Sequence, residues 1–118
     1  MKRTLIGLLG LTCAAWLGLF ALLTAPPPGA ASARVFIEQR ALRFETQTLD
    51  VSAGTVLRFF NADPVEHNVM VLKDGTRLED HYQAPGSATD IAFDEAGFFK
   101  VRCAIHPRMA LDVTVTDR

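Results

Sequence analysis

The sequence is poor in cysteine. Its 118 residues include two, Cys13 and Cys103. Cys13 lies in an apolar run near the N-terminus, so Cys103 is the one cysteine that remains if this run is removed after export. An exported domain with one cysteine cannot form an internal disulfide. Its thiol is then buried and inert, paired with another chain, or bound to a metal.

The sequence also lacks a basic stripe. Residues 34–118 contain all thirteen acidic residues of the chain and ten of its twelve basic ones, which gives this part a net charge of −3. This balance excludes a nucleic-acid-binding surface, and we expect no nucleic-acid partner. There is no internal repeat, and the one low-complexity tract is a run of prolines. Residues 34–118 are therefore expected to form one domain with a single modest core.

The N-terminal segment has the parts of a secretory signal. Lys2 and Arg3 precede an uncharged apolar run over residues 4–24. Three prolines end the run, and Ala-Ser-Ala at residues 31–33 offers a cleavage site of small residues. A positive end, an apolar middle and an A-x-A sequence are typical of export to the periplasm or another extracytoplasmic compartment.

The length of the apolar run leaves a second interpretation open. A signal core has about 7–15 apolar residues, whereas a membrane span needs about 20. We therefore expect residues 1–33 to be a signal peptide or a membrane-anchor helix followed by a Pro/Ala linker, with residues 4–24 as the anchoring segment if it is kept.

Residues 34–118 show the period-two alternation of β-strands. Asn61-Ala62-Asp63-Pro64 and Lys73-Asp74-Gly75 supply strong turn signals between alternating segments. No segment carries a helical apolar face. About seven short strands separated by turns predict an all-β sandwich or barrel. The inward-facing residues are expected to be Leu49 and Val51, Leu57 and Phe59, Val69 and Val71, Ile91 and Phe93, and Leu111, Val113 and Val115.

Two potential metal ligands continue inward-facing rows of these strands. In the strand before Cys103, the charged Lys100 and Arg102 alternate with apolar residues, so Cys103 should face the core. The same alternation places His67 on the inward face with Val69. Both residues lie at strand ends, which cluster at the poles of a sandwich, so the pattern permits them to meet there.

A short loop near the C-terminus contains further soft donors. Cys103, His106 and Met109 lie within seven residues, and His67 is 36 residues before Cys103. Two imidazoles and one thiolate with a weak axial thioether form the trigonal ligand set of a blue-copper centre. Pro107 fixes one backbone angle in the loop. These residue types at this spacing predict a copper site.

Other interpretations fit the residues less well. A buried cysteine is often a small hydrophobe, and a lone histidine is often structural. Zinc prefers four good ligands, and a thioether is a poor one. A dinuclear copper centre would need a second loop cysteine. A cysteine–histidine hydrolase would need an oxyanion loop and an acid partner, which are not apparent. His81 has no comparable neighbours and is expected at the surface.

The two ligand segments together resemble a cupredoxin. They are DPVEHNV at residues 63–69 and GFFKVRCAIHPRM at residues 97–109. The Cys-x2-His-Pro-x-Met loop is most similar to amicyanin and related plastocyanin-like proteins. The likeness covers nearly all of the domain, from about Val35 to Val115. The loop alone is moderately specific, and the upstream His-Asn and the Gly-aromatic strand make the combination strong.

The resemblance implies a cupredoxin-like Greek-key β-sandwich over residues 34–118, holding one type 1 copper ion. It implies His67, Cys103 and His106 as strong ligands and Met109 as the axial ligand. It also implies that the backbone N–H of Asn68 stabilises the thiolate and that its side chain ties the two ligand loops together.

By the same resemblance, we expect a monomeric carrier of single electrons rather than an enzyme. Its partners would be a redox donor and acceptor, for example a c-type cytochrome or a dehydrogenase, and His106 would be the exit point for the electron. One alternative is a periplasmic copper carrier or chaperone that delivers the ion. Another is a cupredoxin-like interaction domain without copper.

The sequence departs from the family pattern at two positions near the ligands. Glu66 precedes His67 where close relatives often have proline. Arg108 follows Pro107 where amicyanin-like loops have an aromatic residue. Charges at these positions could change which partner docks and could change the potential of the copper.

Overall fold

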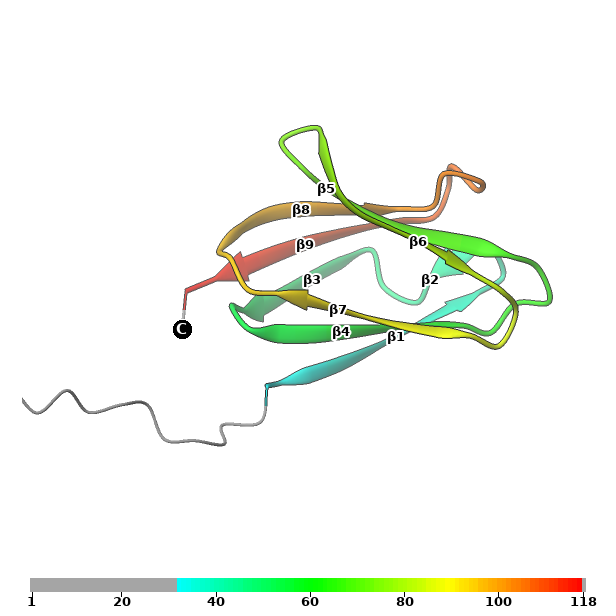
Figure 1. Cartoon of the computed structure of the whole chain (residues 1–118), viewed down its shortest axis with the longest axis horizontal. Coiled ribbons are helices and arrows are strands. Elements are labelled where there is room, and N and C mark those ends of the chain that lie inside the picture. The colour runs from blue at the N-terminus through cyan, green and yellow to red at the C-terminus, as the bar shows by residue number, and fades with distance from the viewer. Residues whose placement is uncertain (1–31, 118) are drawn as a thin grey trace, which may run out of the picture.

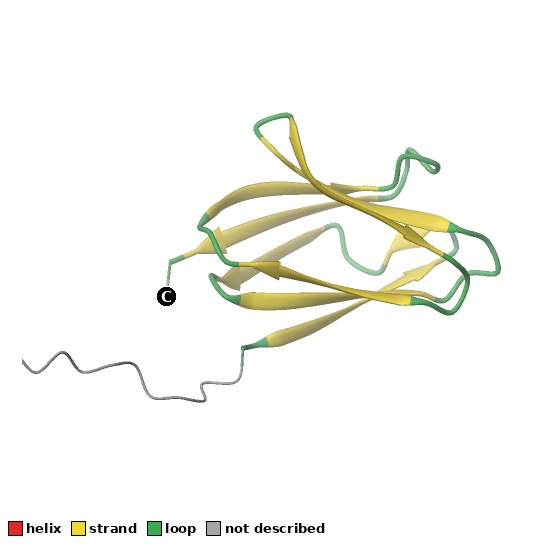
Figure 2. Cartoon of the chain, viewed as in Figure 1, coloured by secondary structure: helices red, strands yellow, loops and turns green. Residues whose placement is uncertain are grey.

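The computed structural model describes residues 32–117 (Figure 1). This part of the chain forms strands and no helix (Figure 2). The strands are β1 (Arg34–Arg40), β2 (Arg43–Phe44), β3 (Thr48–Ser52), β4 (Thr55–Asn61), β5 (His67–Lys73), β6 (Thr76–Gln83), β7 (Ala88–Phe93), β8 (Gly97–Arg102) and β9 (Ala110–Thr116).

The expected signal or anchor helix lies outside the described residues, as does nearly all of the segment 1–33 assigned to it. Within residues 32–117, no helix is long and apolar enough to cross a membrane.

The strands form two sheets that pack face to face. The first has the order β2-β1-β4-β7, and the second has the order β3-β9-β8-β5-β6. β1 pairs with β4 and β3 pairs with β9 in parallel, and the other pairs are antiparallel. The predicted all-β sandwich is therefore confirmed. The strands beyond the expected seven or so include the two-residue β2 and the largely exposed β6. Neither has the alternation of apolar and polar residues that predicts a strand.

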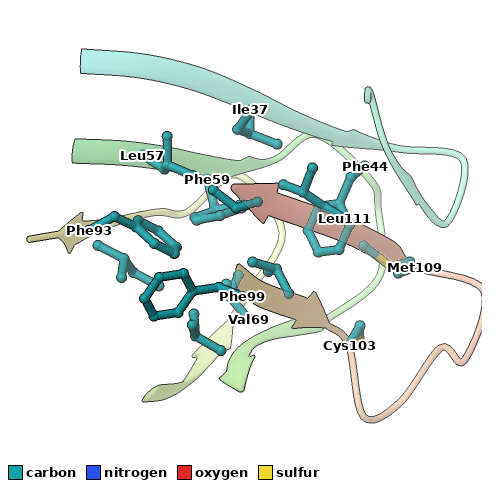
Figure 3. Packing of buried hydrophobic residues seen from close by; sticks show 14 of the residues in the cluster. Ile37, Phe44, Leu57, Phe59, Val69, Phe93, Phe99, Cys103, Met109 and Leu111 are labelled. Carbon is teal, nitrogen blue, oxygen red and sulfur yellow. The ribbon is translucent and has the colours of Figure 1, made fainter. Parts of the chain in front are cut away.

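The core lies between the sheets and is built by the predicted alternation. Phe44 and Phe59 pack edge to face with ring centroids 5.8 Å apart, and Phe93 and Phe99 do so at 5.3 Å. Figure 3 shows inward-pointing side chains from both sheets, with Cys103 among them. The buried apolar residues are Ile37, Phe44, Leu57, Phe59, Val69, Val71, Ile91, Phe93, Phe99, Val101, Cys103, Met109, Leu111, Val113 and Val115.

Three connections meet at one pole of the sandwich. They are the turn between β1 and β2, the β4–β5 loop of residues 62–66, and the β8–β9 loop of residues 103–109 (Figure 1). Antiparallel pairing of β5 with β8 brings the start of β5 beside the end of β8. The segments that carry the candidate ligands therefore lie next to each other.

Phe59 should be critical for stability, because its side chain is fully buried and packs against Phe44. Replacing Phe59 with alanine (Phe59→Ala) should lower the free energy of unfolding by about 3–5 kcal/mol. Urea denaturation measures this change. The matched control is Phe98→Ala, because Phe98 is 49% exposed; it should cost less than about 1 kcal/mol. Equal losses in the two variants would contradict the assigned core.

Candidate metal centre

Two imidazoles and one thiol converge at the pole of the sandwich. The Nδ1 atoms of His67 and His106 are 3.0 Å apart, and the Sγ of Cys103 is 3.7 Å from Nδ1 of His106. The three donor atoms all lie within 4.8 Å of one another. His67 is fully buried, Cys103 is 3% exposed and His106 is half-buried. The structure thus brings together three residues that the sequence separates by up to 39 positions.

The loop from Cys103 to Met109 is closed by its own backbone. The N–H of Met109 donates to the carbonyl of His106 at 3.0 Å, and the N–H of Cys103 donates to the carbonyl of Met109 at 3.3 Å. Met109 is fully buried, and Figure 3 shows it at one end of the loop with Cys103 at the other. This turn lets one short segment contribute two donors, Cys103 and His106, to the same place.

Asn68 connects the two segments that carry the converging donors. Its backbone N–H donates to Sγ of Cys103 at 3.4 Å, and its Oδ1 accepts a hydrogen bond from the N–H of Ala104 at 2.6 Å. Its Nδ2 donates to Asp80 at 2.7 Å. Hydrogen bonds from Arg77 and then from Asn68 hold the pKa of Asp80 below its ordinary value, despite the opposing effect of desolvation. The Asn68 side chain is thereby fixed at both ends.

Asp63 contacts the other side of the His67 ring. Its Oδ2 lies 2.8 Å from Nε2 of His67 and accepts a hydrogen bond from the N–H of Leu42 at 3.0 Å, and its Oδ1 accepts one from the N–H of Ala41 at 2.6 Å. Burial raises the pKa of Asp63, but hydrogen bonds from Leu42, His67 and Ala41 outweigh it and lower the pKa below its ordinary value. A carboxylate is therefore the natural state of this side chain at neutral pH.

The converging atoms fit one small metal ion. Two nitrogens that each lie about 2.0–2.1 Å from one ion are about 3.3–3.6 Å apart in tetrahedral or trigonal geometry. The observed nitrogen–nitrogen distance of 3.0 Å is close to this range, and the sulfur–nitrogen distance of 3.7 Å is longer, as a metal–sulfur bond of about 2.3 Å requires. A thiolate with imidazoles suits copper in both oxidation states. The chemistry of the donor set therefore fits a copper ion.

The edge of the site reaches the protein surface at His106. A shallow groove there is lined by the β1–β2 turn and the β8–β9 loop. Ile105 and Leu42 are 47% and 42% exposed, which makes this end of the molecule locally apolar. The residues that line the groove are Ala41, Leu42, Arg43, His106, Pro107 and Arg108.

Several residues outside the cluster also have clear positions. His81 lies on β6 at the surface, as expected, and pairs with Glu79 at 2.7 Å. Glu66 is exposed and accepts a hydrogen bond from the hydroxyl of Tyr82 at 2.8 Å.

The contact of Asp63 with His67 was not predicted. The only signal in the sequence was an acidic residue four positions before the histidine, within a segment that reads as a turn.

Comparisons with known proteins agree with this geometry. The family model for copper-binding proteins of the plastocyanin/azurin family matches residues 31–116. The structure is similar to a reduced tryptophan-to-tyrosine variant of amicyanin, at 25% sequence identity and a TM-score of 0.65, over 73% of this chain and 85% of that chain. A Cu(I) form of a methionine-to-alanine variant of amicyanin matches with the same identity, TM-score and coverage. No curated protein sequence matched the chain.

The family match includes every residue of the cluster. The expected cupredoxin-like fold is confirmed, and copper is the cofactor that the family and the donor set indicate. The chain belongs to the plastocyanin/azurin family of copper-binding proteins, the cupredoxins.

Proposed function

We propose that this protein is a blue copper protein that carries single electrons between redox partners. The observation that carries the proposal is the convergence of two imidazole nitrogens and one thiol sulfur within 4.8 Å at a buried pole. His67, Cys103 and His106 would be the strong ligands, and the buried Met109 would be the weak axial ligand. The bound copper would supply a one-electron couple.

The proposed ligand set favours electron transfer over catalysis at the metal. Four side-chain donors from the protein would leave no coordination position for a substrate. Because β5 and β8 are paired strands, His67 and Cys103 are attached to a rigid framework. A framework of this kind resists rearrangement when the charge of the ion changes. We therefore propose a carrier and not an enzyme.

His106 is the proposed exit point for the electron. It is the partly exposed member of the cluster and lines the apolar groove with Leu42 and Pro107. Arg43 and Arg108 lie in the same groove, and both are exposed. Apolar contact would allow close approach, and the two arginines would favour a partner with acidic groups around its own redox centre. A c-type cytochrome or a dehydrogenase would serve as donor or acceptor.

Export of the protein is part of the same proposal. The N-terminal sequence has the features of a signal or an anchor. We propose a monomer that works in the periplasm or a similar extracytoplasmic space, with residues 34–118 as the copper domain.

The alternative function is delivery of copper to another protein. The same donors would serve a carrier that releases its ion. The two functions differ in what happens to the metal: an electron carrier retains copper through repeated reduction and oxidation, whereas a delivery protein transfers it to an acceptor. Burial of His67 and Cys103 slows exchange of the ion and therefore favours the electron carrier.

The first prediction of this proposed function concerns the copper centre itself. Titration of residues 34–118 with Cu(II) should give an intense blue absorption band that saturates at one equivalent, because the thiolate of Cys103 would bond to the ion. Cys103→Ala should abolish the band. His81→Ala is the matched control, since His81 is the one histidine outside the cluster, and it should leave the band unchanged. A colourless wild-type protein would instead favour an interaction domain without copper.

The second prediction concerns Asn68, which we propose holds the two ligand loops in register. Asn68→Ala removes the hydrogen bonds to Ala104 and Asp80, and should lower the free energy of unfolding by about 1–3 kcal/mol because it deletes two side-chain hydrogen bonds, one of them to a carboxylate. The amide of Ala104 should exchange with solvent faster. Asp80→Ala removes only one of these bonds and is the matched control. Unchanged exchange at Ala104 in Asn68→Ala would contradict the proposed role.

The third prediction concerns the charge of the exit face. Arg108→Gln should slow oxidation of the Cu(I) protein by the anion hexacyanoferrate(III) at low salt, because one attractive charge beside His106 is lost. The effect should shrink as salt screens it. Stopped-flow absorption measures the rate. Arg34→Gln, with the same charge change at the far end of β1, should leave the rate nearly unchanged. Equal effects of both substitutions would contradict an exit at His106.

A further inference from the structure

The two nitrogens of the His67 ring face different groups. Nδ1 lies 3.0 Å from His106, on the side where the soft donors converge, and Nε2 lies 2.8 Å from Oδ2 of Asp63. An ionised carboxylate can only accept hydrogen bonds, so the proton of the neutral imidazole must be on Nε2. The lone pair is then on Nδ1, directed at the proposed copper position. The contact with Asp63 therefore selects the form of His67 that can bind a metal.

Asp63 is held by groups that suit an anion. It is 8% exposed, and the backbone N–H groups of Ala41 and Leu42 both donate to its carboxylate. With His67, these make three donors to two oxygens of one side chain. Such an arrangement stabilises a charge that would otherwise be costly to bury. Asp63 thus places a fixed negative charge immediately behind His67.

The donors to Asp63 come from a turn with an unusual backbone. Ala41 has a φ of 52° and Leu42 a φ of 58°. A two-residue turn with both φ angles positive favours asparagine and glycine, and it is strained for alanine and leucine. Strained turns of this kind persist where the surroundings hold them, and they cluster at functional sites. The carboxylate of Asp63 fixes both amides of this turn, so one side chain determines the turn and the orientation of the histidine.

We propose that Asp63 is a positioning residue that orients His67 toward the copper and lowers the reduction potential of the centre. A fixed negative charge behind a ligand stabilises Cu(II) more than Cu(I), since Cu(II) has the larger charge. A carboxylate hydrogen-bonded to a metal-binding histidine also makes that ligand more basic. This inference rests on the proposed function, because it takes His67 as a copper ligand.

Its test needs a variant that keeps the turn intact. Asp63→Asn removes the charge, but an amide offers one acceptor oxygen where the carboxylate offers two, so the turn could open. Asparagine and glycine are the favoured residues for such a turn. Replacing Ala41 and Leu42 by these two residues should let the turn form without the hydrogen bonds to Asp63. Asp63→Asn is therefore made both alone and in the background of Ala41→Asn and Leu42→Gly, and its potential in that background is compared with the potential of the background alone.

In this background, Asp63→Asn should keep the blue band and lower the affinity for Cu(II) by about 10–100-fold. The affinity for Cu(I) should change less. Each tenfold fall in the ratio of the Cu(II) affinity to the Cu(I) affinity raises the one-electron potential by about 59 mV. The control is Glu66→Gln, which removes the same charge from an exposed side chain next to His67 in sequence. Its shift should be much smaller, because water and salt screen an exposed charge.

Nitrogen NMR of the imidazoles in the metal-free protein tests the orienting role separately. His67 should carry its proton on Nε2, and Asp63→Asn should weaken that preference. A proton on Nδ1 of His67 in the wild-type protein would overturn the orienting role. A potential that shifts no more in Asp63→Asn than in Glu66→Gln would overturn the electrostatic role.

Failure of the proposed function would look different from failure of this inference. A wild-type protein without a thiolate–copper band would overturn the electron-carrier function and, with it, any effect of Asp63 on the potential. The NMR measurement needs no copper, so it would still decide whether Asp63 orients His67. A normal band in the wild-type protein with no shift in the Asp63 variants would overturn the inference alone.

Discussion

The antiparallel pairing of β5 with β8 is the constraint on which the site depends. Its register places Met70 opposite Arg102, which brings the start of β5 beside the residues that follow β8. Asn68 then reaches Cys103 through its backbone and Ala104 through its side chain. A shift of one residue would turn His67 away from the core, since successive side chains of a strand face opposite sides. The position of the donors is therefore a consequence of sheet pairing.

The remaining parts of the pole hold these donors in place. The β8–β9 loop closes on itself and presents His106 next to His67. The β1–β2 turn comes from the other sheet and reaches His67 through Asp63. Donors fixed by both sheets need little rearrangement when the charge of a bound ion changes. Such rigidity is what a one-electron centre requires, and it connects the packing of the sandwich to the proposed function.

Much of this arrangement could be predicted from the sequence, because alternation reports directly on burial. The inward positions of Leu57, Val69 and Leu111 follow from it, and so does the all-β sandwich. The short loop around Cys103 predicted soft donors from their residue types, and two of its residues, Cys103 and His106, lie in the converging cluster with His67. The edge strand β6 was harder to predict from the sequence, because most of its side chains are exposed and do not alternate between apolar and polar. The contact of Asp63 with His67 could not be predicted, because it depends on a strained turn contributed by the opposite sheet.

The most direct test of the central claim is X-ray absorption spectroscopy of the copper-loaded protein in both oxidation states. The account predicts one short copper–sulfur bond and two copper–nitrogen bonds in Cu(II) and in Cu(I), with nearly equal distances in the two states. This result would show that the paired strands hold the donors while the charge changes. Copper bound only by nitrogen and oxygen atoms would contradict this account. So would the loss of a histidine ligand on reduction, because the account requires a rigid electron-transfer centre at His67, Cys103 and His106.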